Sequence, residues 1–242
     1  MNEGAPPVAT GGAPSRWQTV RMDPLQTRMA TVGLRALADF RFVLAGGYAL
    51  RAHGFGDRDS DDIDLFTDVL DVERFAAAVE RLVDAYRNDG LATEVIRQAP
   101  LFARLVVDET AKADLGVDHR QFPPVQLDLG PVLSEQDAVG GKVGAVYSRL
   151  EPRDLIDVQV ILDSGRYDPD TLLALADQRE ATPLDRPMLA GQLLAGSRLP
   201  DSGFERYGAT PQLIARIRRT ARAWGEHLLE DGMGRPSGTM GS

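Results

Sequence analysis

Two aspartates that alternate with apolar residues, in Asp62-Ile63-Asp64-Leu65, carry the strongest chemical signal in the sequence. Residues two apart in a β-strand project to the same face, so this pattern predicts that the two carboxylates stand side by side. Carboxylates this close repel each other unless a cation lies between them. Hard oxygen ligands of this kind suit Mg²⁺, which also binds the phosphates of a substrate. The pair therefore predicts a magnesium site.

A third carboxylate on a neighbouring strand would complete a site for one or two metal ions. Asp114 is the best candidate, because Lys112-Ala113-Asp114-Leu115 shows the same alternation and places its apolar residues on the opposite face. Asp118 and Asp128 are weaker alternatives for this position.

A diglycine, Gly46-Gly47, ends the apolar run 40–45 and precedes the acidic motif. Glycines after a buried strand allow backbone amides to approach a phosphate closely. Taken separately, the diglycine is only a turn and the acidic run 59–64 is only a solvated loop. Together the two motifs favour a metal-dependent nucleotide site.

The elements that must position these residues follow from hydrophobic periodicity and from turn and cap signals. Strands are expected at 40–45, 62–66, 91–97, 101–108, 111–118 and 125–129. Helices are expected at 25–39, 48–53, 71–87, 135–150 and 152–162. The sequence thus predicts a core domain over 21–165 and a helical C-terminal region over 166–230, with disordered tails at 1–20 and 231–242.

Composition excludes several classes of protein. The chain has 242 residues, 43% hydrophobic and 26% charged, and no cysteine, which excludes disulfides, cysteine-ligated zinc and thiol catalysis. It contains neither a run of 18 apolar residues nor a signal-peptide pattern, so we expect a soluble, cytoplasmic protein without membrane contact. The net charge of −9 argues against broad coating of nucleic acid but allows a local basic groove.

Four segments in order resemble the nucleotidyltransferase toxin family AbiEii/AbiGii, of the DNA polymerase beta-like nucleotidyltransferase superfamily. They are Leu44-Ala45-Gly46-Gly47-Tyr48-Ala49-Leu50; Arg58-Asp59-Ser60-Asp61-Asp62-Ile63-Asp64-Leu65-Phe66-Thr67; Ala111-Lys112-Ala113-Asp114-Leu115; and the stretch from Val132 through Lys142 to Asp157. The resemblance covers about residues 25–165. Two departures, Gly140-Gly141 before the lysine and Ile156 in place of an aromatic residue, remove no chemical group.

The resemblance implies an α+β fold, with a mixed sheet flanked by helices and a helical C-terminal region. It also implies transfer of a nucleotidyl group from an NTP to an acceptor hydroxyl, with release of pyrophosphate. Asp62 and Asp64 would hold the Mg²⁺ that bridges the triphosphate, and Asp114 would complete the metal site and activate the acceptor. Gly46 and Gly47 would cradle the phosphates.

Further roles implied by the resemblance fall on Ser60, which would bind the phosphate or cap the turn, and on Lys142, which would reach the triphosphate. Of the 27 basic residues only Lys112 and Lys142 are lysines. This scarcity favours a functional role for Lys142 over that of an ordinary surface lysine. Asp154 and Asp157, one helical turn apart, would orient Lys142 or reach the acceptor or base. Which of the two is functional stays open, and helix salt bridges with arginines are the alternative.

The acceptor implied by the resemblance is RNA, with the tRNA 3′ end as the expected position, and a cognate antitoxin protein would restrain the enzyme. A small molecule such as an aminoglycoside, or a protein, is the alternative acceptor, and the acidic net charge suits a cationic drug slightly better. A catalytically inactive nucleotide-binding module is the third hypothesis. The retained carboxylates and Lys142 argue against it.

Overall fold

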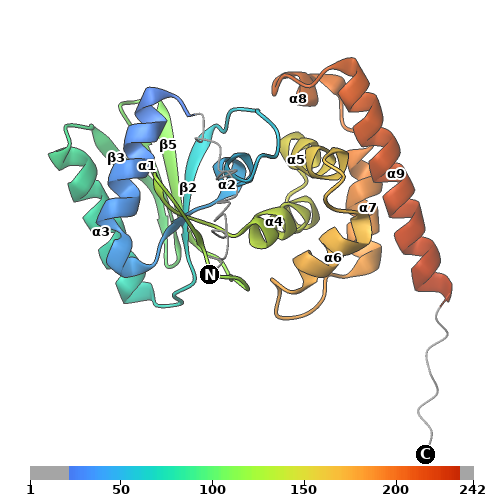
Figure 1. Ribbon diagram of the computed structural model, residues 1–242, viewed down its shortest axis with the longest axis horizontal. Coiled ribbons are helices and arrows are strands. Elements are labelled where there is room, and N and C mark those ends of the chain that lie inside the picture. The colour runs from blue at the N-terminus through green and yellow to red at the C-terminus, as the bar shows by residue number, and fades with distance from the viewer. Residues whose placement is uncertain (1–21, 235–242) are drawn as a thin grey trace, which may run out of the picture.

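A seven-stranded mixed sheet forms the centre of the N-terminal half, in a computed structural model that describes residues 22–234 (Figure 1). Its strands are β1 (Val43–Leu44), β2 (Asp62–Thr67), β3 (Thr93–Ala99), β4 (Phe102–Val107), β5 (Ala111–Val117), β6 (Val125–Leu127) and β7 (Gly130–Val132), in the order β3-β4-β5-β2-β1-β7-β6. The pairs β2–β5 and β1–β7 are parallel, and the other neighbours are antiparallel.

The two faces of this sheet have different chemistry because apolar and polar residues alternate along β2, β4 and β5. The odd-numbered positions of these strands are apolar except for Thr67 at the end of β2, and the central ones are buried, for example Ile63, Leu65, Leu105 and Leu115. They pack beneath α1 (Pro24–Ala36) and α3 (Val72–Asn88), where a Cβ on Gly33 would lie 3.0 Å from Leu65. Burial of each such side chain stabilises the fold by about 1.5–3 kcal/mol. The even-numbered positions therefore face the opposite side.

Several helices of this molecule begin at a capping side chain. Asp23 accepts a hydrogen bond from the backbone of the first turn of α1, and Asp71 does so for α3. Ser134 caps α4 (Glu135–Ser148), and Asp168 caps α6 (Pro169–Asp177). Each cap is worth about 1 kcal/mol.

Helices alone make up the C-terminal half, beside the second face of the sheet (Figure 1). After α4 come α5 (Pro152–Asp163), α6, α7 (Arg186–Gly196), α8 (Asp201–Glu205) and α9 (Pro211–Gly234). α4 packs against α5 and α6, and α7 packs along α9. Gly140 is needed at the α4–α6 contact, because a Cβ there would lie 2.9 Å from the backbone of Leu175. The glycine that departs from the family pattern thus permits close helix packing.

Most predicted elements are present with boundaries shifted by a few residues. The run predicted as one strand at 40–45 divides into a short 3-10 helix, η1 (Ala38–Phe40), and the two-residue strand β1, because Arg41 takes a left-handed conformation between them. The diglycine begins a helix, α2 (Gly46–Ala52), and β7 had no expected counterpart.

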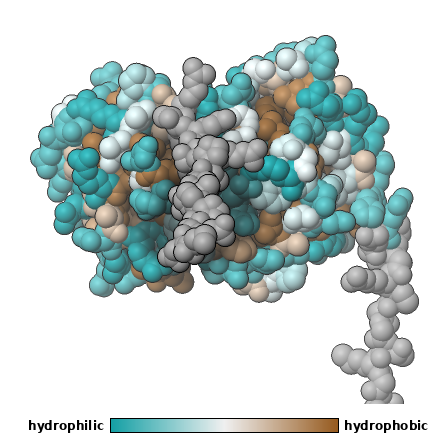
Figure 2. Space-filling view, viewed as in Figure 1, coloured by the Kyte–Doolittle hydropathy of each residue, from teal (hydrophilic) through white to brown (hydrophobic). Residues whose placement is uncertain are grey.

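The predicted tails lie largely outside the described residues. The segment 1–20 is entirely outside, whereas α9 continues four residues into the segment 231–242 before the described part ends. No helix within residues 22–234 has the length and apolarity that a membrane span needs. Figure 2 shows mainly hydrophilic residues on the face in view, with apolar residues gathered in patches on both halves.

Candidate functional site

A cleft between the second face of the sheet and helix α4 brings together most of the predicted site. The predicted residues that line it are Gly46, Gly47, Ser60, Asp62, Asp64, Asp114 and Lys142. Asp154 and Asp157 lie on α5 and do not line this cleft; they contact the residues around it. Residues from β2, β5, the loop before β2, α2 and α4 therefore converge at one place.

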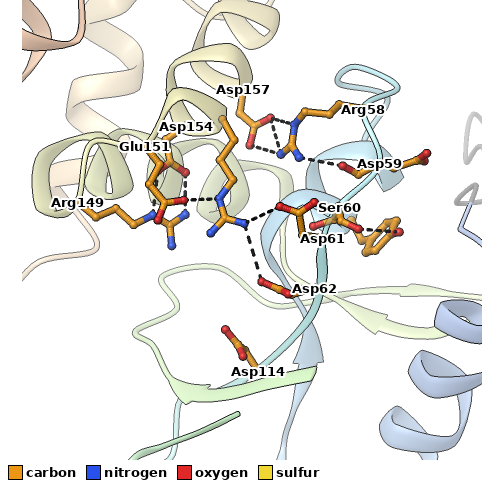
Figure 3. A network of polar contacts seen from close by, with 12 residues as sticks. Arg58, Asp59, Ser60, Asp61, Asp62, Asp114, Arg149, Glu151, Asp154 and Asp157 are labelled. Carbon is orange, nitrogen blue, oxygen red and sulfur yellow. Dashed lines mark hydrogen bonds and ion pairs between the residues drawn. The ribbon is translucent and has the colours of Figure 1, made fainter. Parts of the chain in front are cut away.

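The three strand carboxylates owe their proximity to the register of β2 and β5. Asp64 lies directly opposite Asp114 in this parallel pair, and Asp62 is two residues before Asp64 on the same face. Figure 3 shows Asp62 and Asp114 on these neighbouring strands, facing the helices. Of the weaker candidates for the third position, Asp118 lines the cleft but pairs with Arg179, and Asp128 is exposed outside it.

Burial and mutual repulsion raise the pKa values of two of these carboxylates. Burial raises the pKa of Asp62, and the nearby charge of Asp114 raises it further, against the opposing effect of Arg104 and Arg153. Burial also raises the pKa of Asp64 to about 6, where Lys142 lowers it and the other two aspartates raise it. The raised pKa values mean that burial and the neighbouring carboxylates disfavour the ionised form of both side chains.

The donor set fits a hard divalent cation such as Mg²⁺. The side chain of Asp62 is nearly buried, and its Oδ1 has no hydrogen-bond partner among the described residues. An acceptor oxygen buried without a partner costs free energy unless a cation or a donor binds there. Asp62 and Asp64 are the residues that would hold the ion, with carboxylate oxygens of the type that Mg²⁺ prefers.

Arg104, which sequence reasoning missed, holds the third carboxylate. Its Nε lies 2.7 Å from Oδ1 of Asp114 and its Nη2 lies 2.6 Å from Oδ2, while Nη2 is 3.9 Å from Asp62. Arg104 is the cross-strand neighbour of Asp114 in the antiparallel β4–β5 pair. Within residues 22–234, no three metal-ligating side chains are arranged around a common point. The only sequence signal for Arg104 is its position on the polar side of an alternating strand.

The diglycine lies against the carboxylates at the start of α2. Gly46 has φ +60°, and a Cβ there would lie 1.8 Å from Oδ2 of Asp64, so no other residue fits without displacing that side chain. A Cβ on Gly47 would lie 3.0 Å from Oγ of Ser60. The first N–H groups of a helix lack intrahelical partners and can bind an anion. The glycines thus place such N–H groups beside the aspartates.

Lys142 is buried on α4, and its Nζ lies 2.8 Å from Oδ2 of Asp157. Asp157 also accepts hydrogen bonds from Nη2 of Arg58, at 3.1 and 3.0 Å (Figure 3). The Arg58 guanidinium in turn lies 5.4 Å from the ring of Tyr207. Asp157 is therefore shared between two cations, and Arg58 is a second contributor to the site that the sequence did not predict, although it belongs to the acidic motif.

Asp154 is fully buried and pairs with Arg149, at 2.9 Å to Nε and 2.7 Å to Nη2. Burial alone would raise its pKa, but these hydrogen bonds and the positive charge of Lys142 hold the pKa below its usual value. This contact is the helix salt bridge that was the alternative interpretation of Asp154.

A second, open cavity adjoins the carboxylates at the rim of the cleft. We call its cationic side the basic rim, defined by Arg104, Lys112, Arg149, Arg153 and Arg206. Tyr207 lies in the same cavity, with the guanidinium of Arg206 4.7 Å from its ring. Acidic side chains are present as well, and Arg153 lies 2.7 Å from Glu151. Cations of the sheet and of the helical half thus face one opening.

Comparison with known proteins gives a family and a fold. Residues 34–204 match the model of the family described as "Nucleotidyl transferase AbiEii toxin, Type IV TA system". The nucleotidyltransferase toxin MenT4 of Mycobacterium tuberculosis H37Rv is similar to this chain, with 23% identity, 84% of this chain and 83% of that chain covered, and a TM-score of 0.54. JHP933 of Helicobacter pylori is 14% identical over 88% of this chain and 97% of that chain, with a TM-score of 0.49. No curated protein matches. The predicted α+β nucleotidyltransferase core with a helical C-terminal part is confirmed.

Proposed function

The chain belongs to the AbiEii family of nucleotidyltransferase toxins of toxin–antitoxin systems, and from that premise we propose a Mg²⁺-dependent transfer of NMP from an NTP to an RNA hydroxyl. The observation that carries this proposal is the convergence of three strand carboxylates, a buried lysine and a diglycine helix start in one cleft. Each of these groups has a task in nucleotidyl transfer.

On the sheet side, Asp62 and Asp64 would bind the metal, which supplies charge neutralisation at the triphosphate. Asp114, once free of Arg104, would accept the proton of the acceptor hydroxyl. The acceptor oxygen then forms a bond to the α-phosphorus, and the bond from that phosphorus to pyrophosphate breaks. The backbone N–H groups beside Gly46 and Gly47 would hold the phosphates in line for this displacement.

On the helix side, Lys142 would stabilise the negative charge that develops on the leaving pyrophosphate. A compact ammonium suits this task because it acts as a mobile point charge. Oδ2 of Asp157 lies 2.8 Å from its Nζ and would orient the lysine side chain. Of the two helix carboxylates, Asp157 is thus the one that we assign to the reaction, and Asp154 is assigned to holding Arg149.

The basic rim supports an anionic acceptor. Although the whole chain carries a net charge of −9, five cations and Tyr207 face the opening beside Asp62. Phosphate groups bind to arginine and lysine, and an unpaired base stacks on an aromatic ring. We therefore favour the 3′ end of tRNA over a cationic aminoglycoside. Arg216 and Arg218 on α9 are less suited to this role, because they do not line this opening.

A cognate antitoxin protein is the proposed partner, in keeping with the family, and the cytoplasm is the proposed location. The function is tested by incubating the full chain with Mg²⁺, each labelled NTP, and either total tRNA, an aminoglycoside mixture or the protein alone. We expect label on tRNA, no label with Asp62→Ala or with EDTA, and none on tRNA whose 3′ ribose has been oxidised by periodate.

Other results would redirect or overturn the proposal. Label on the drug or on the protein itself would replace the RNA acceptor but leave nucleotidyl transfer intact. If wild type and Asp62→Ala gave the same absence of label with every acceptor, and affected growth equally, the chain would be an inactive nucleotide-binding module.

A further inference from the structure

The third carboxylate of the cleft is already bound to a cation of the protein itself. Both oxygens of Asp114 accept hydrogen bonds from the Arg104 guanidinium, in the two-pronged geometry that makes arginine–carboxylate pairs strong. The pair is set by strand register, since the two residues are direct cross-strand neighbours. Asp114 is therefore engaged on both oxygens before any substrate binds.

The neighbouring carboxylates are in a different state. Asp62 keeps an unpartnered buried oxygen, and its closest cations, Arg104 and Arg153, are each 3.9 Å away. Arg104 thus divides its positive charge unequally, with two short bonds to Asp114 and one distant contact to Asp62. The lone pairs of Asp114 that face the guanidinium are occupied by these hydrogen bonds, so Arg104 competes with a metal ion or a proton for this carboxylate.

The side chain of Arg104 is also placed so that it can move away from Asp114. Its side chain is 33% exposed, whereas that of Asp114 is 9% exposed, and Arg104 lines the open rim cavity beside Lys112 and Arg153. The guanidinium can turn toward solvent or toward an anion in that cavity without disturbing the apolar side of β4, which points to the opposite face of the sheet.

We propose that Arg104 is a positioning residue that competes with the divalent cation for Asp114 and so sets the metal affinity of the cleft. Without a metal ion, Arg104 neutralises Asp114. When the third carboxylate joins the metal site or accepts a proton, the two-pronged bond weakens or opens. This inference rests on the proposed function, because it concerns the metal site assigned there.

The test measures binding of Mn²⁺ alone to the full chain, by electron paramagnetic resonance of the free ion. Arg104→Gln is expected to bind Mn²⁺ about tenfold more tightly than wild type, because about 1.4 kcal/mol of competition is removed. Arg104→Lys keeps the charge but loses the second prong, and it too should bind more tightly. The matched control is Lys112→Gln, which removes a charge opposite Asp62 in the β2–β5 register without a bond to Asp114; a change within about twofold is expected.

A double-mutant cycle separates competition at Asp114 from a general effect of charge. In an Asp114→Asn background, Arg104→Gln should no longer tighten Mn²⁺ binding. The inference is overturned if Arg104→Gln increases the Mn²⁺ affinity no more than Lys112→Gln does. It is also overturned if Arg104→Gln still increases the affinity in the Asp114→Asn background. A merely structural role would lower the thermal midpoint of unfolding without changing Mn²⁺ affinity. Should Arg104→Gln fail to fold, Arg104→Lys gives the same decision.

Failure of this inference is distinguishable from failure of the proposed function. If Mn²⁺ binding by wild type is lost in Asp62→Asn but unaffected by position 104, the metal site stands and the competition does not. If Mn²⁺ binding is the same in wild type and Asp62→Asn, the proposed metal site itself is wrong.

Discussion

Two pairs of aspartates of this molecule are in opposite electrostatic states: Asp62 and Asp64, which line the cleft on what we call the sheet wall, and Asp154 and Asp157 on α5 behind the cleft, which we call the helix wall. On the sheet wall, Asp62 and Asp64 have raised pKa values, because burial and mutual repulsion outweigh the nearby cations. On the helix wall, Asp154 has a lowered pKa and Asp157 is shared by two cations. Burial by itself does not cause the difference, because Asp154 is the most buried residue of the four.

What differs is the supply of cations from within the fold. The α4 helix with its C-terminal cap and the loop before β2 supply Lys142, Arg149 and Arg58, which form ion pairs with the two aspartates of α5. On the sheet wall Arg104 bonds Asp114, whereas the nearest cations of Asp62 are 3.9 Å away, at the place where a metal and a triphosphate would enter. Function is thus expected where charge is uncompensated, and stability where it is compensated.

Asp64→Asn, on the sheet wall, is expected to have the largest effect on activity. Loss of a metal ligand should lower the rate of NMP transfer on the order of a thousandfold, because several kcal/mol of transition-state stabilisation disappear. The free energy of unfolding at pH 7 should stay equal or rise, since repulsion is relieved. Denaturant titration together with labelled-NTP transfer checks both. A large loss of stability in this variant would contradict the contrast between the walls.

A second test replaces the lysine of the helix wall while keeping its charge. Lys142→Arg should lose about tenfold to a hundredfold in activity, because the larger planar group at this buried position competes with Arg58 for Asp157 and no longer presents a point charge. Lys112→Arg, at an exposed position, is the matched control and should retain its rate. Steady-state kinetics with varied NTP measure the effect. Full activity of Lys142→Arg would show that Lys142 has a structural role and no role in the reaction.

The third test removes the compensated charge. Asp154→Asn should lower the free energy of unfolding by about 1–3 kcal/mol, because a fully buried partner of Arg149 is lost. Arg149 is half exposed and can be solvated, which keeps the cost below that of a fully buried pair. Activity per folded molecule should stay near wild type, and the exposed Asp128→Asn should change nothing. A loss of rate as large as that of Asp64→Asn would show that Asp154 takes part in the reaction.

The sheet wall was more predictable from sequence than the helix wall, and the reason is physical. Alternation in Asp62-Ile63-Asp64 reports the strand period directly, so side-by-side placement of the two aspartates follows from a few neighbouring residues. The Arg104–Asp114 contact depends on strand order and register, which those neighbouring residues do not encode. The diglycine was predicted to form a turn because it follows an apolar run, whereas in the structure it begins α2 and Gly46 lies against Asp64.

Long-range pairs account for the rest of what the sequence left open. Arg58 and Asp157 are 99 residues apart in the chain, and nothing in either neighbourhood indicates that they meet. The same holds for the basic rim, which joins Lys112 of the sheet to Arg206 of the helical half. Individual motifs thus predicted which residues carry chemistry, while tertiary packing decides which of them are neutralised.

The smallest expected effect is a pH dependence confined to the sheet wall. The pKa of Asp64 is about 6 in the folded protein against a usual value of 3.8, so between these values the folded chain holds a proton that the unfolded chain has lost. Stability of the metal-free protein should therefore fall as pH rises from about 4 to about 6, by a few degrees in the midpoint of thermal unfolding. Asp64→Asn removes the proton exchange and should show a flatter profile over this interval. Asp154→Asn, whose wild-type carboxylate has a lowered pKa, should retain the fall between pH 4 and 6. Parallel profiles for wild type and Asp64→Asn would show that the sheet wall is no more strained by charge than the helix wall.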